Sequence, residues 1–519
     1  MTETAAQQTP AVVAGDSPPP VAIQRDARGW ITNWDADDEA FWAHDGRRVA
    51  RRNLVLSVFA EHIGFSIWVL WTVIVVNLGN VGISLTLSQQ FWLTAVPNLI
   101  GSALRLPYTF AIPRFGGRRW TAFSAGLLLI PCLLAAIVVP SGWLRAQSPS
   151  MQFWVLLVCA ATAGVGGGNF SSSMANISFF FPERAKGLAL GINAAGGNLG
   201  VAVAQLVVPL VVIVGVPATA VRAPVHPVYL AYAGLVWLPF IVVAMIGAAW
   251  KMDSLAQART DTSSYVAALR APQTWIMSLL YIGTFGSFIG FSFALPVVIK
   301  NTFPSFLAHH SFVATYLAGL AFLGALVGSL SRPFGGWLAD RWGGARVTIA
   351  CFVAMSAATG VGAMGVRRQS FAMFLGSYLV VFLLAGMDNG STYRMIPTIF
   401  RELGRRRASE LDVEPHETAL EFKRRAAAVI GIAGAIGAFG GFLIQVVLRQ
   451  SSLHVSALMK AATTPAAKAQ IAATHSDWSL PALETFLIAY LVLAALTWWC
   501  YLRSQWFVRR VPSLADARI

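Results

Sequence analysis

The stretch GVGGGNFSSSMANISFFFPERAKGLALGINAAGGNLGVAVAQ, from Gly164 to Gln205, decides the fold. It places glycines, amides and aromatic side chains within two apolar segments that a short charged turn separates. Its second part aligns without a gap on GIAGAIGAFGGFLIQ, Gly431 to Gln445, pairing Gly191 with Gly431, Gly197 with Gly437, Gly200 with Gly440 and Gln205 with Gln445. This repeat predicts a duplicated membrane protein with its ligand path between the two halves.

Two further matches extend the repeat along the chain. Arg105 precedes Gly116 by eleven residues in RLPYTFAIPRFGGRR, as Arg332 precedes Gly343 in RPFGGWLADRWGGAR. The tetrapeptide IGFS occurs at residues 63–66 and again at 289–292. The matches predict two homologous six-helix bundles, related by a pseudo-two-fold axis along the membrane normal, with the substrate at their interface.

The composition indicates an integral membrane protein. Of 519 residues, 56% are hydrophobic and only 12% are charged, which is too apolar for a soluble protein of ordinary composition. The net charge of +15 comes from basic residues that cluster between apolar runs. There they are expected to face anionic membrane lipid and to set the orientation, so we expect no nucleic-acid partner.

The sequence predicts neither an enzyme nor a cofactor or metal site. Its four cysteines lie inside apolar runs, and neither they nor the eight histidines have the spacing of metal ligands. It also lacks a Gly-rich phosphate loop followed by Lys-Ser or Lys-Thr. We therefore expect no cofactor and no primary transport driven by ATP.

Runs of about 20 apolar residues predict twelve membrane helices. They lie at 54–77, 91–113, 119–140, 152–176, 186–213, 228–250, 274–299, 313–337, 346–365, 371–397, 425–448 and 482–503. An even number places both termini on one side, and the clusters of arginine and lysine favour the cytoplasmic side.

These runs divide the chain into five parts. We expect a cytoplasmic tail at 1–53, a six-helix bundle at 54–250, a cytoplasmic linker at 251–273, a second bundle at 274–503 and a tail at 504–519. Residues 1–28 are predicted to be disordered, without a cleaved signal peptide. Residues 29–53 are predicted to form an amphipathic lead-in on the inner membrane surface, and 401–425 a solvated loop. The outer loop 453–478 has no chemistry that we can assign.

Several motifs together resemble those of a known family. The loops PRFGGRRW and ADRWGGAR resemble the gating-loop motif of the major facilitator superfamily, with its residues at Gly116, Gly117, Asp340, Gly343 and Gly344. The arginines in GSALRLPY and GSLSRPFGG, the segment GGGNFSSSMANISFFFP and both glycine-rich signatures are similar to the nitrate/nitrite porters of that superfamily. The resemblance covers nearly the whole chain from residue 29 to residue 510. It implies an all-α fold of twelve transmembrane helices in the inner membrane of a bacterium, secondary transport of nitrate, nitrite or both, and a monomeric carrier.

Arg105 and Arg332 lie in the middle of two apolar helices, at equivalent positions of the repeat. A charge there costs at least about 2.5–3.5 kcal/mol on insertion scales. This cost favours a functional role over an arginine that snorkels to an interface or pairs with a buried acid. Two guanidinium groups that face each other would clamp a small planar oxyanion, because each presents parallel donors in one plane.

Aromatic and amide side chains complete the predicted anion site. The resemblance assigns Phe170 and Phe285 to the two sides of a flat anion, whereas an isolated phenylalanine in a membrane helix usually serves packing. Tyr281 lies one helical turn before Phe285 and offers a hydroxyl on the same face. Asn198 offers an amide, and its counterpart in the second half is Ala438. We therefore expect one anion to be bound asymmetrically.

The two glycine-rich signatures allow two interpretations. Glycines that recur at about one helical turn let helices approach closely. In a carrier whose halves rock, the same smooth faces would also let the helices slide between inward-open and outward-open states. The residues concerned are Gly191, Gly197 and Gly200 in the first half and Gly431, Gly437 and Gly440 in the second.

Three titratable residues within the predicted helices are candidates for proton coupling: Glu61, His62 and Asp388. The alternative is a structural role, with Glu61 paired to an arginine or to His62, and Asp388 bound to Arg394 or to a backbone amide. The sequence AEHIGFSIW resembles the first helix of the branch of nitrate porters that symports protons. This resemblance implies nitrate/proton symport, and nitrate/nitrite antiport is the alternative.

Two other functions remain open at this point. A carrier of the same fold for another small anion, such as a monocarboxylate, would explain the arginines but not the aromatic pair. A nitrate-binding receptor without flux would need a signalling domain, and the sequence has no visible one.

Overall fold

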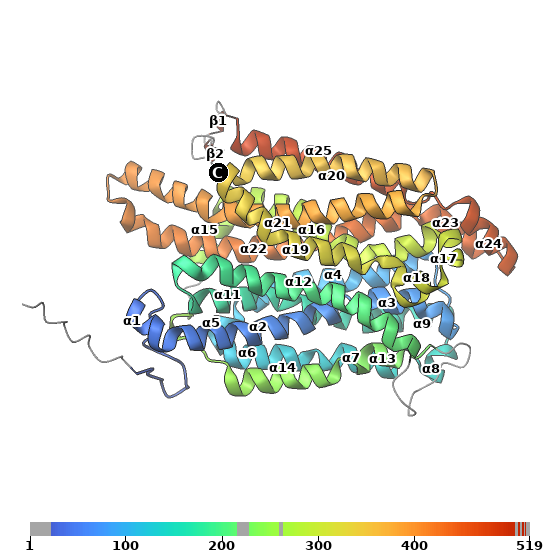
Figure 1. Cartoon of the computed structure of the whole chain (residues 1–519), viewed down its shortest axis with the longest axis horizontal. Coiled ribbons are helices and arrows are strands. Elements are labelled where there is room, and N and C mark those ends of the chain that lie inside the picture. Colours follow the sequence, from blue (N-terminus) through green and yellow to red (C-terminus); the bar gives the residue numbers. More distant parts are fainter. Residues whose placement is uncertain are drawn as a thin grey trace, which may run out of the picture.

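The computed structural model describes residues 22–214, 228–258, 263–503, 507–508, 511–512, 514 and 519. The described chain forms two helical bundles that lie side by side, one from each half of the sequence (Figure 1). Both ends of the described chain lie at the same end of the bundles, called here the terminal end, and the opposite end is called the far end. The predicted disorder of residues 1–28 falls largely outside the described residues.

The first bundle is formed by the helices of residues 39–251. These are α1 Glu39–Phe41, α2 Arg47–Trp68, α3 Trp71–Asn77, α4 Leu87–Thr109, α5 Ala111–Phe115, α6 Gly117–Leu127, α7 Leu129–Ile137, α8 Gly142–Arg145, α9 Pro149–Thr162, α10 Gly164–Gly168, α11 Phe170–Phe180, α12 Glu183–Val214, α13 Ala231–Leu235 and α14 Leu238–Lys251. Helices α9, α10 and α11 form one interrupted span. It is interrupted at Ala163 and Asn169, on either side of the glycine-rich helix α10 (GVGGG), because glycine is a poor helix former.

The second bundle follows a short linker. Its elements are α15 Ser263–Arg270, α16 Pro272–Thr302, α17 Pro304–His309, α18 Ser311–Tyr316, α19 Phe322–Trp342, α20 Gly344–Arg367, α21 Phe371–Leu411, α22 Pro415–Ser451, α23 Leu453–Ala461, α24 Pro465–Thr474 and α25 Leu480–Tyr501. After the last helix, two strands of two residues each, β1 Phe507–Val508 and β2 Val511–Pro512, pair antiparallel.

Ten helical runs in the described residues are long and apolar enough to cross a membrane. They are Glu39–Val81, Gly117–Ile137, Pro149–Phe180, Arg184–Ile213, Ala231–Lys251, Pro272–Thr302, Gly344–Arg367, Phe371–Leu411, Glu421–Ser451 and Leu480–Tyr501. Two of the twelve predicted spans are therefore missing from this set, and they correspond to α4 and α19. These helices have 23 and 21 residues, but their composition is more polar, and they carry Arg105 and Arg332.

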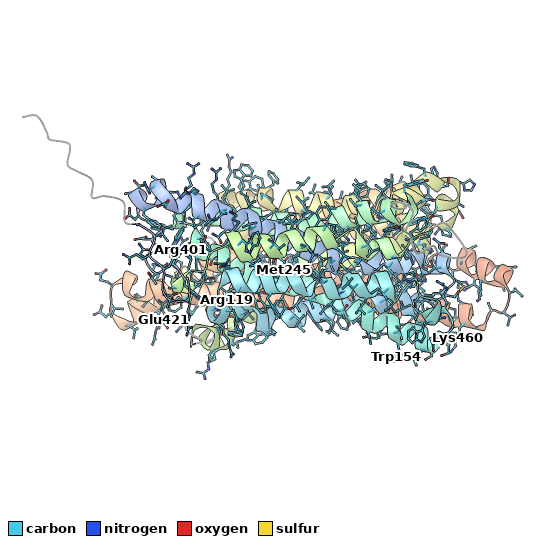
Figure 2. The ribbon with its side chains drawn as sticks, turned by 90° about the horizontal axis from the view of Figure 1, so that it is seen from below. Arg119, Trp154, Met245, Arg401, Glu421 and Lys460 are labelled. Atoms are coloured by element: carbon cyan, nitrogen blue, oxygen red, sulfur yellow. The ribbon has the colours of Figure 1, made fainter. Side chains whose placement is uncertain are left out.

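The surface between the two ends of the bundles is apolar. Figure 2 shows Arg119, Arg401 and Glu421 near the terminal end, Trp154 and Lys460 near the far end, and Met245 between them. Large hydrophobic side chains are exposed along the bundles, among them Ile137, Trp154, Val243, Leu330, Val380 and Ile488. A belt of this kind is expected to face lipid chains.

The two halves meet through helices that carry the repeated motifs. Helix α4, with Arg105, packs against α22, which carries the second glycine-rich signature. Helix α19, with Arg332, packs against α12, which carries the first signature. Each arginine helix thus contacts the signature helix of the opposite half, as a pseudo-two-fold arrangement requires.

The two gating-loop motifs have the same backbone conformation. Gly116 has φ = 80° and Gly343 has φ = 90°, values that favour glycine because a side chain would clash with the backbone. A Cβ atom on Gly117 would lie 2.1 Å from the side chain of Asn176, and one on Gly344 would lie 2.4 Å from Met395. The second motif also forms an ion pair, between Asp340 and Arg394. The repeat therefore extends to the turns that begin α6 and α20.

The structure corrects the prediction of a solvated loop at 401–425. Helix α21 continues to Leu411, and α22 already begins at Pro415. Ion pairs one helical turn apart support both extensions, because Glu402 binds Arg405 and Arg406, and Glu421 binds Arg425. The outer loop 453–478 is also largely helical, as α23 and α24.

The structure also corrects the prediction of an amphipathic lead-in at 29–53. Only its second part is helical, whereas Trp30, Ile31 and Trp34 lie in an irregular segment and are buried. The N–H of Ile31 donates to the carbonyl of Ser254 at 2.8 Å, and the N–H of Ala256 donates to the carbonyl of Ile31 at 2.9 Å. The linker after α14 thus supplies hydrogen bonds that a helix would have made internally.

Asp253 in this linker holds the N-terminal segment to the first bundle. Its carboxylate accepts hydrogen bonds from Arg25 and Arg52, both at 2.6 Å, and from Asn53 at 3.0 Å. Burial favours a raised pKa, but these hydrogen bonds outweigh it and hold the pKa of Asp253 below its ordinary value. The resulting stabilisation is complete above the ordinary aspartate pKa of about 3.9. It is lost as the pH falls through the lower pKa of the folded state.

We expect Asp253→Asn to release the N-terminal segment at neutral pH. The variant leaves Arg25 and Arg52, which are 42% and 40% exposed, without their anion. Trypsin should then cut after Arg28 at least about tenfold faster, since cleavage follows the population of the open form.

Asp45→Asn is the matched control for this measurement. Asp45 pairs with Arg48, whose side chain is 79% exposed, and such a pair contributes little to stability. Its cleavage rate should equal that of the wild type. Equal rates for the wild type and Asp253→Asn would contradict the role given to Asp253.

Candidate functional site

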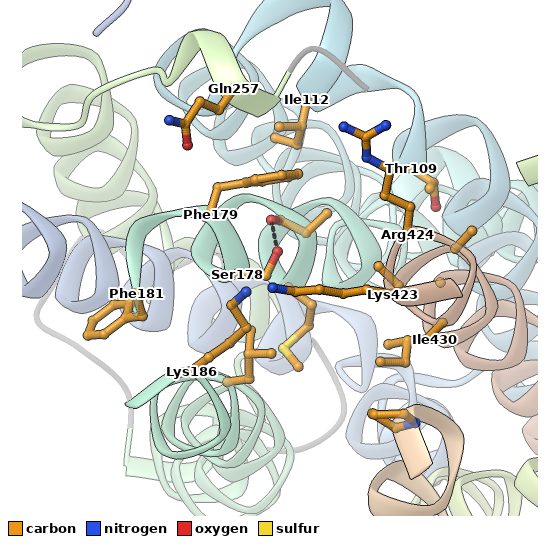
Figure 3. Close-up of a pocket in the computed structure, with 18 of the residues that line it drawn as sticks. Thr109, Ile112, Ser178, Phe179, Phe181, Lys186, Gln257, Lys423, Arg424 and Ile430 are labelled. Carbon is orange, nitrogen blue, oxygen red and sulfur yellow. Dashed lines mark hydrogen bonds between the residues drawn. The ribbon is translucent and has the colours of Figure 1, made fainter. Parts of the chain in front are cut away.

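A cavity of ≈ 1160 Å³ lies between the two halves and reaches the terminal end. The charged residues in its wall are Asp35, Asp37, Lys186, Arg401, Arg405, Lys423 and Arg424. Lys186 from α12 and Lys423 from α22 point into this space from different halves (Figure 3). Because basic residues outnumber acidic ones, the mouth attracts anions and raises their local concentration.

The deep end of the cavity is formed by Phe170, Tyr393 and Gly434. Each of these residues contacts one of the two predicted arginines. The ring of Phe170 lies 4.8 Å from Cζ of Arg105, and the ring of Tyr393 lies 5.0 Å from Cζ of Arg332. The arginines therefore lie one layer of side chains beyond the cavity, and in this conformation they are closed off from it.

Arg105 is fully buried and links the two halves. Its Nε donates to the carbonyl of Gly167 at 3.0 Å, and its Nη1 donates to the carbonyl of Gly434 at 2.7 Å. Its Nη2 has no hydrogen-bond partner among the described residues. The guanidinium thus keeps one end available for an acceptor, although it lies where water is excluded.

Arg332 is also buried, at 6% exposure, on the other side of the interface. Its Nη2 donates to the hydroxyl of Tyr281 at 3.4 Å. Its Nη1 has no partner in the described part of the chain. No ion pair with a carboxylate is formed by Arg332 or Arg105 within those residues. The alternative of a buried acid as partner is therefore not seen there.

Three aromatic rings connect the arginines. Phe170 and Phe285 are nearly parallel, with an angle of 16° and 6.1 Å between ring centres, and Tyr281 stacks on Phe285 at 5.6 Å. The ring of Phe285 lies 4.9 Å from Cζ of Arg105. A flat anion between two rings needs about 7 Å, which is two contacts of about 3.5 Å. The pair is thus oriented for a planar guest but must separate by about 1 Å to admit it.

Asn198 is buried on α12, and its Oδ1 has no partner among the described residues. No hydrogen bond or ring contact in this part of the chain connects it to Arg105, Arg332 or the three rings. The structure therefore brings five of the six predicted binding residues into one cluster, and it leaves Asn198 outside that cluster, on α12.

The glycine-rich signatures lie at close helix contacts. A Cβ atom on Gly200 would lie 2.2 Å from the carbonyl oxygen of His62, and one on Gly437 would lie 2.2 Å from the ring of Tyr281. A Cβ atom on Gly197 would lie 3.3 Å from the side chain of Glu61, and one on Gly440 would lie 2.8 Å from the carbonyl oxygen of Ile282 on α16. By contrast, Gly191 has open space around it, and Gly431 has only ordinary contacts of 3.6 Å or more. Packing therefore explains some of these glycines and not others.

Glu61 lies in the core of the first half. Its Oε1 accepts a hydrogen bond from Nδ2 of Asn169 at 2.7 Å, and its Oε2 has no partner among the described residues. Asn169 directly precedes Phe170, which contacts Arg105. A change at the carboxyl of Glu61 can therefore reach the anion cluster through two adjacent residues.

The other two candidates for coupling are placed differently. Nδ1 of His62 lies 3.0 Å from the carbonyl oxygen of Gly196, so His62 does not pair with Glu61. Asp388 is fully buried on α21, and neither of its carboxyl oxygens makes a hydrogen bond within the described chain. The alternative considered for Asp388, a pairing with Arg394, is not formed, because Arg394 binds Asp340.

Sequence reasoning missed Tyr393 and the two backbone carbonyls that orient Arg105. Tyr393 lies between Arg332 and the cavity and packs 5.1 Å from Tyr281. A signal for it was present, since the segment MDNGSTYR is polar for the middle of a membrane helix. The carbonyls of Gly167 and Gly434 carry no such signal, because any residue offers one. No group of three His, Cys, Asp or Glu side chains suited to a metal ion occurs among the described residues.

Comparison with known proteins gives a consistent result. The sequence profile of the Major Facilitator Superfamily matches residues 54–444. The nitrate/nitrite transporter NarU of Escherichia coli (strain K12) is 36% identical over 494 residues, which cover 93% of this chain and 98% of that protein. The probable nitrate/nitrite antiporter NarK2 of Thermus thermophilus is 35% identical over 433 residues, which cover 81% and 89%.

Solved structures share the fold at low sequence identity. A D-xylose–proton symporter matches with a TM-score of 0.60 at 15% identity, covering 86% of this chain and 96% of that one. A bacterial homologue of the human lysosomal transporter Spinster matches with a TM-score of 0.53 at 15% identity, covering 87% and 96%. At this identity the likeness concerns the fold alone.

Proposed function

The chain belongs to the major facilitator superfamily and, within it, to the NarK-like nitrate/nitrite porters, and we propose that it carries nitrate and nitrite by alternating access between its two halves. We place this multi-pass protein in the inner membrane of a bacterium as a single chain, with both termini in the cytoplasm, because basic residues gather at the terminal end. The cavity then opens to the cytoplasm. The protein acts as a secondary transporter, without catalysis and without a cofactor.

The observation that carries this proposal is the pair of buried arginines without a carboxylate partner. A buried charge is costly unless an opposite charge and hydrogen bonds compensate for it. Arg105 and Arg332 each keep a guanidinium nitrogen without a partner in the described chain. Nitrate or nitrite supplies one negative charge and oxygen atoms in one plane, which suits two planar guanidinium groups.

The aromatic pair supports selection of a flat anion. If Phe170 and Phe285 separate by about 1 Å, a planar guest fits between them, whereas a tetrahedral phosphate or sulfate is too thick. The Tyr281 hydroxyl already contacts Arg332 and would orient an anion oxygen. We assign Asn198 a second, later contact, made when α12 moves relative to α19.

We further propose that Glu61 carries the proton in nitrate/proton symport. Its carboxyl is buried, has one oxygen without a partner in the described chain, and is joined through Asn169 to the residue that contacts Arg105. Protonation of Glu61 and binding of the anion can thus influence each other. The alternative is nitrate/nitrite exchange, which the name of the Thermus relative favours.

Glu61→Gln is expected to abolish nitrate uptake driven by an inward proton gradient and to leave nitrate binding intact. Glutamine keeps the size of the side chain and an oxygen that accepts from Asn169, but it cannot take up a proton. Uptake is measured in proteoliposomes, and binding is measured by calorimetry on the purified protein. Asp388→Asn is the matched variant, because Asp388 is the other fully buried carboxyl in a described span.

The same liposomes separate symport from exchange. One preparation is loaded with nitrite and has no pH gradient, and the other is empty and has an inward proton gradient. Uptake only with internal nitrite would make the protein an exchanger and leave Glu61, His62 and Asp388 with structural roles. Inhibition of nitrate uptake by formate but not by chlorate would favour a monocarboxylate carrier, and binding without any flux would favour a receptor.

A further inference from the structure

Gln205 and Gln445 are the last matched pair of the repeated signatures, and the anion site uses neither. Both side chains are fully buried. A buried amide is costly unless its donors and acceptors are paired, so such a residue in a membrane helix has a specific partner. The partners of these two glutamines lie on both sides of the interface between the halves.

Gln445 on α22 joins the second half to the first. Its Nε2 donates to the carbonyl of Gly290 on α16 at 2.7 Å. Its Oε1 accepts a hydrogen bond from the hydroxyl of Thr94 on α4 at 2.8 Å. The second of these hydrogen bonds crosses from one half to the other.

Gln205 on α12 crosses the interface in the opposite sense. Its Nε2 donates to the carbonyl of Ser292 on α16 at 2.6 Å, and it lies 3.4 Å from the hydroxyl of Thr72 within its own half. The two glutamines thus approach α16 from different halves and bind carbonyls only two residues apart. Their positions in the signatures match, but their contacts are not symmetric, because both glutamines bind α16 of the second half.

These contacts lie between the anion cluster and the far end. Helix α22 runs from the terminal end to the far end, and Gln445 lies eleven residues beyond Gly434, which binds Arg105, so it is about 16 Å further along the axis. On α16, which runs in the same direction, Gly290 and Ser292 likewise follow Phe285. The hydrogen bonds therefore close the side of the molecule away from the cavity.

We propose that Gln205 and Gln445, with Thr94 and the carbonyls of Gly290 and Ser292, form a glutamine latch that closes the outer side of the carrier. The latch holds the inward-open conformation, and its two hydrogen bonds between the halves, Gln445–Thr94 and Gln205–Ser292, break each time the far end opens. Its residues touch no anion. They act on transport by setting the balance between the two conformations.

The latch rests on the proposed alternating access, but its test needs no transport. Thr94→Val keeps the size of the side chain and removes the donor to Gln445, whose buried oxygen then has no partner. One such hydrogen bond corresponds to about a fivefold change in an equilibrium, and an unpaired buried acceptor adds to it. We therefore expect the population with an open far end to rise at least about fivefold.

Thr72→Val is the matched control. Thr72 is another fully buried threonine near a latch glutamine, but its 3.4 Å contact with Gln205 stays within the first half. Removing its hydroxyl changes no hydrogen bond between the halves. The variant should keep the wild-type balance of conformations.

The populations are read from the distance between spin labels on Ser84→Cys and Ser305→Cys, measured by electron spin resonance. Both serines are exposed, at the far ends of the two halves, and the four native cysteines are buried. A longer distance reports opening of the far end. Thr94→Val should gain this population, and Thr72→Val should not. Equal distance distributions in Thr94→Val and the wild type would overturn the latch.

Gln205→Leu serves as a second variant if Thr94→Val does not fold, and it should shift the same distance. Nitrate uptake by the wild type is measured separately. If uptake fails while the distances shift as expected, the proposed function is wrong and the latch stands. If uptake occurs and neither variant shifts the distances, the latch alone is wrong.

Discussion

We expect Arg105→Lys to lower the rate of nitrate transport at least about thirtyfold, because truncating a buried, hydrogen-bonded charge costs about 2–5 kcal/mol. The guanidinium of Arg105 donates to Gly167 and to Gly434 at once and keeps a third nitrogen for the anion. Lysine keeps the charge but places it at one point, so it cannot serve three acceptors in one plane. Arg332→Lys is expected to behave in the same way.

Initial rates of nitrate uptake into proteoliposomes, over a range of nitrate concentrations, measure this loss. Arg367→Lys is the matched control, since Arg367 lies at the end of α20 and forms an exposed pair with Glu484. Its uptake should equal that of the wild type. Near-normal uptake by Arg105→Lys would mean that charge alone suffices and that the planar clamp is wrong.

Gly437→Ala is expected to reduce transport at least about fivefold, since forcing extra atoms into a packed core typically costs about 1–3 kcal/mol. The added Cβ would lie 2.2 Å from the ring of Tyr281, whose hydroxyl binds Arg332. The ring must therefore move away from the arginine, or α22 must move away from α16. The thermal stability of the purified variant should fall as well.

Gly431→Ala is the control on the same helix. Its Cβ would meet Thr109 at 3.6 Å, an ordinary contact, and alanine is a better helix former than glycine. We expect most of the transport to remain and the stability to stay the same or rise. Gly200→Ala and Gly191→Ala repeat the comparison in the first half. The Cβ atom added at Gly200 would lie 2.2 Å from the carbonyl oxygen of His62, whereas the one added at Gly191 would lie in open space.

This comparison also separates the two interpretations of the signatures. If close packing is their role, only Gly437→Ala and Gly200→Ala lose activity. If smooth sliding is their role, Gly431→Ala and Gly191→Ala should lose transport too, with unchanged stability. The second outcome would assign the glycines to the movement rather than to the resting contacts.

Much of the architecture could be predicted from the sequence, because it depends on patterns that one chain displays. Runs of apolar residues define most of the spans, since lipid leaves a helix no other way to pair its backbone. The matched signatures define the two halves, and the charge of Arg105 and Arg332 marks the anion site by its cost. The aromatic pair came from resemblance to the family and not from any pattern within this chain.

Other features are decided only by tertiary contacts. The lead-in was predicted wrongly because local hydropathy does not reveal a linker that pairs with the N-terminal segment. The loop at 401–425 was also predicted wrongly, although the ion pairs that extend its helices lie one helical turn apart and are local in the sequence. The roles of Tyr393 and of the Gly434 carbonyl depend on which helix faces Arg332 or Arg105. Sequence alone thus determined the helices, the repeat and the buried charges, whereas their partners lie far apart in the chain and were fixed only by the packing of the two halves.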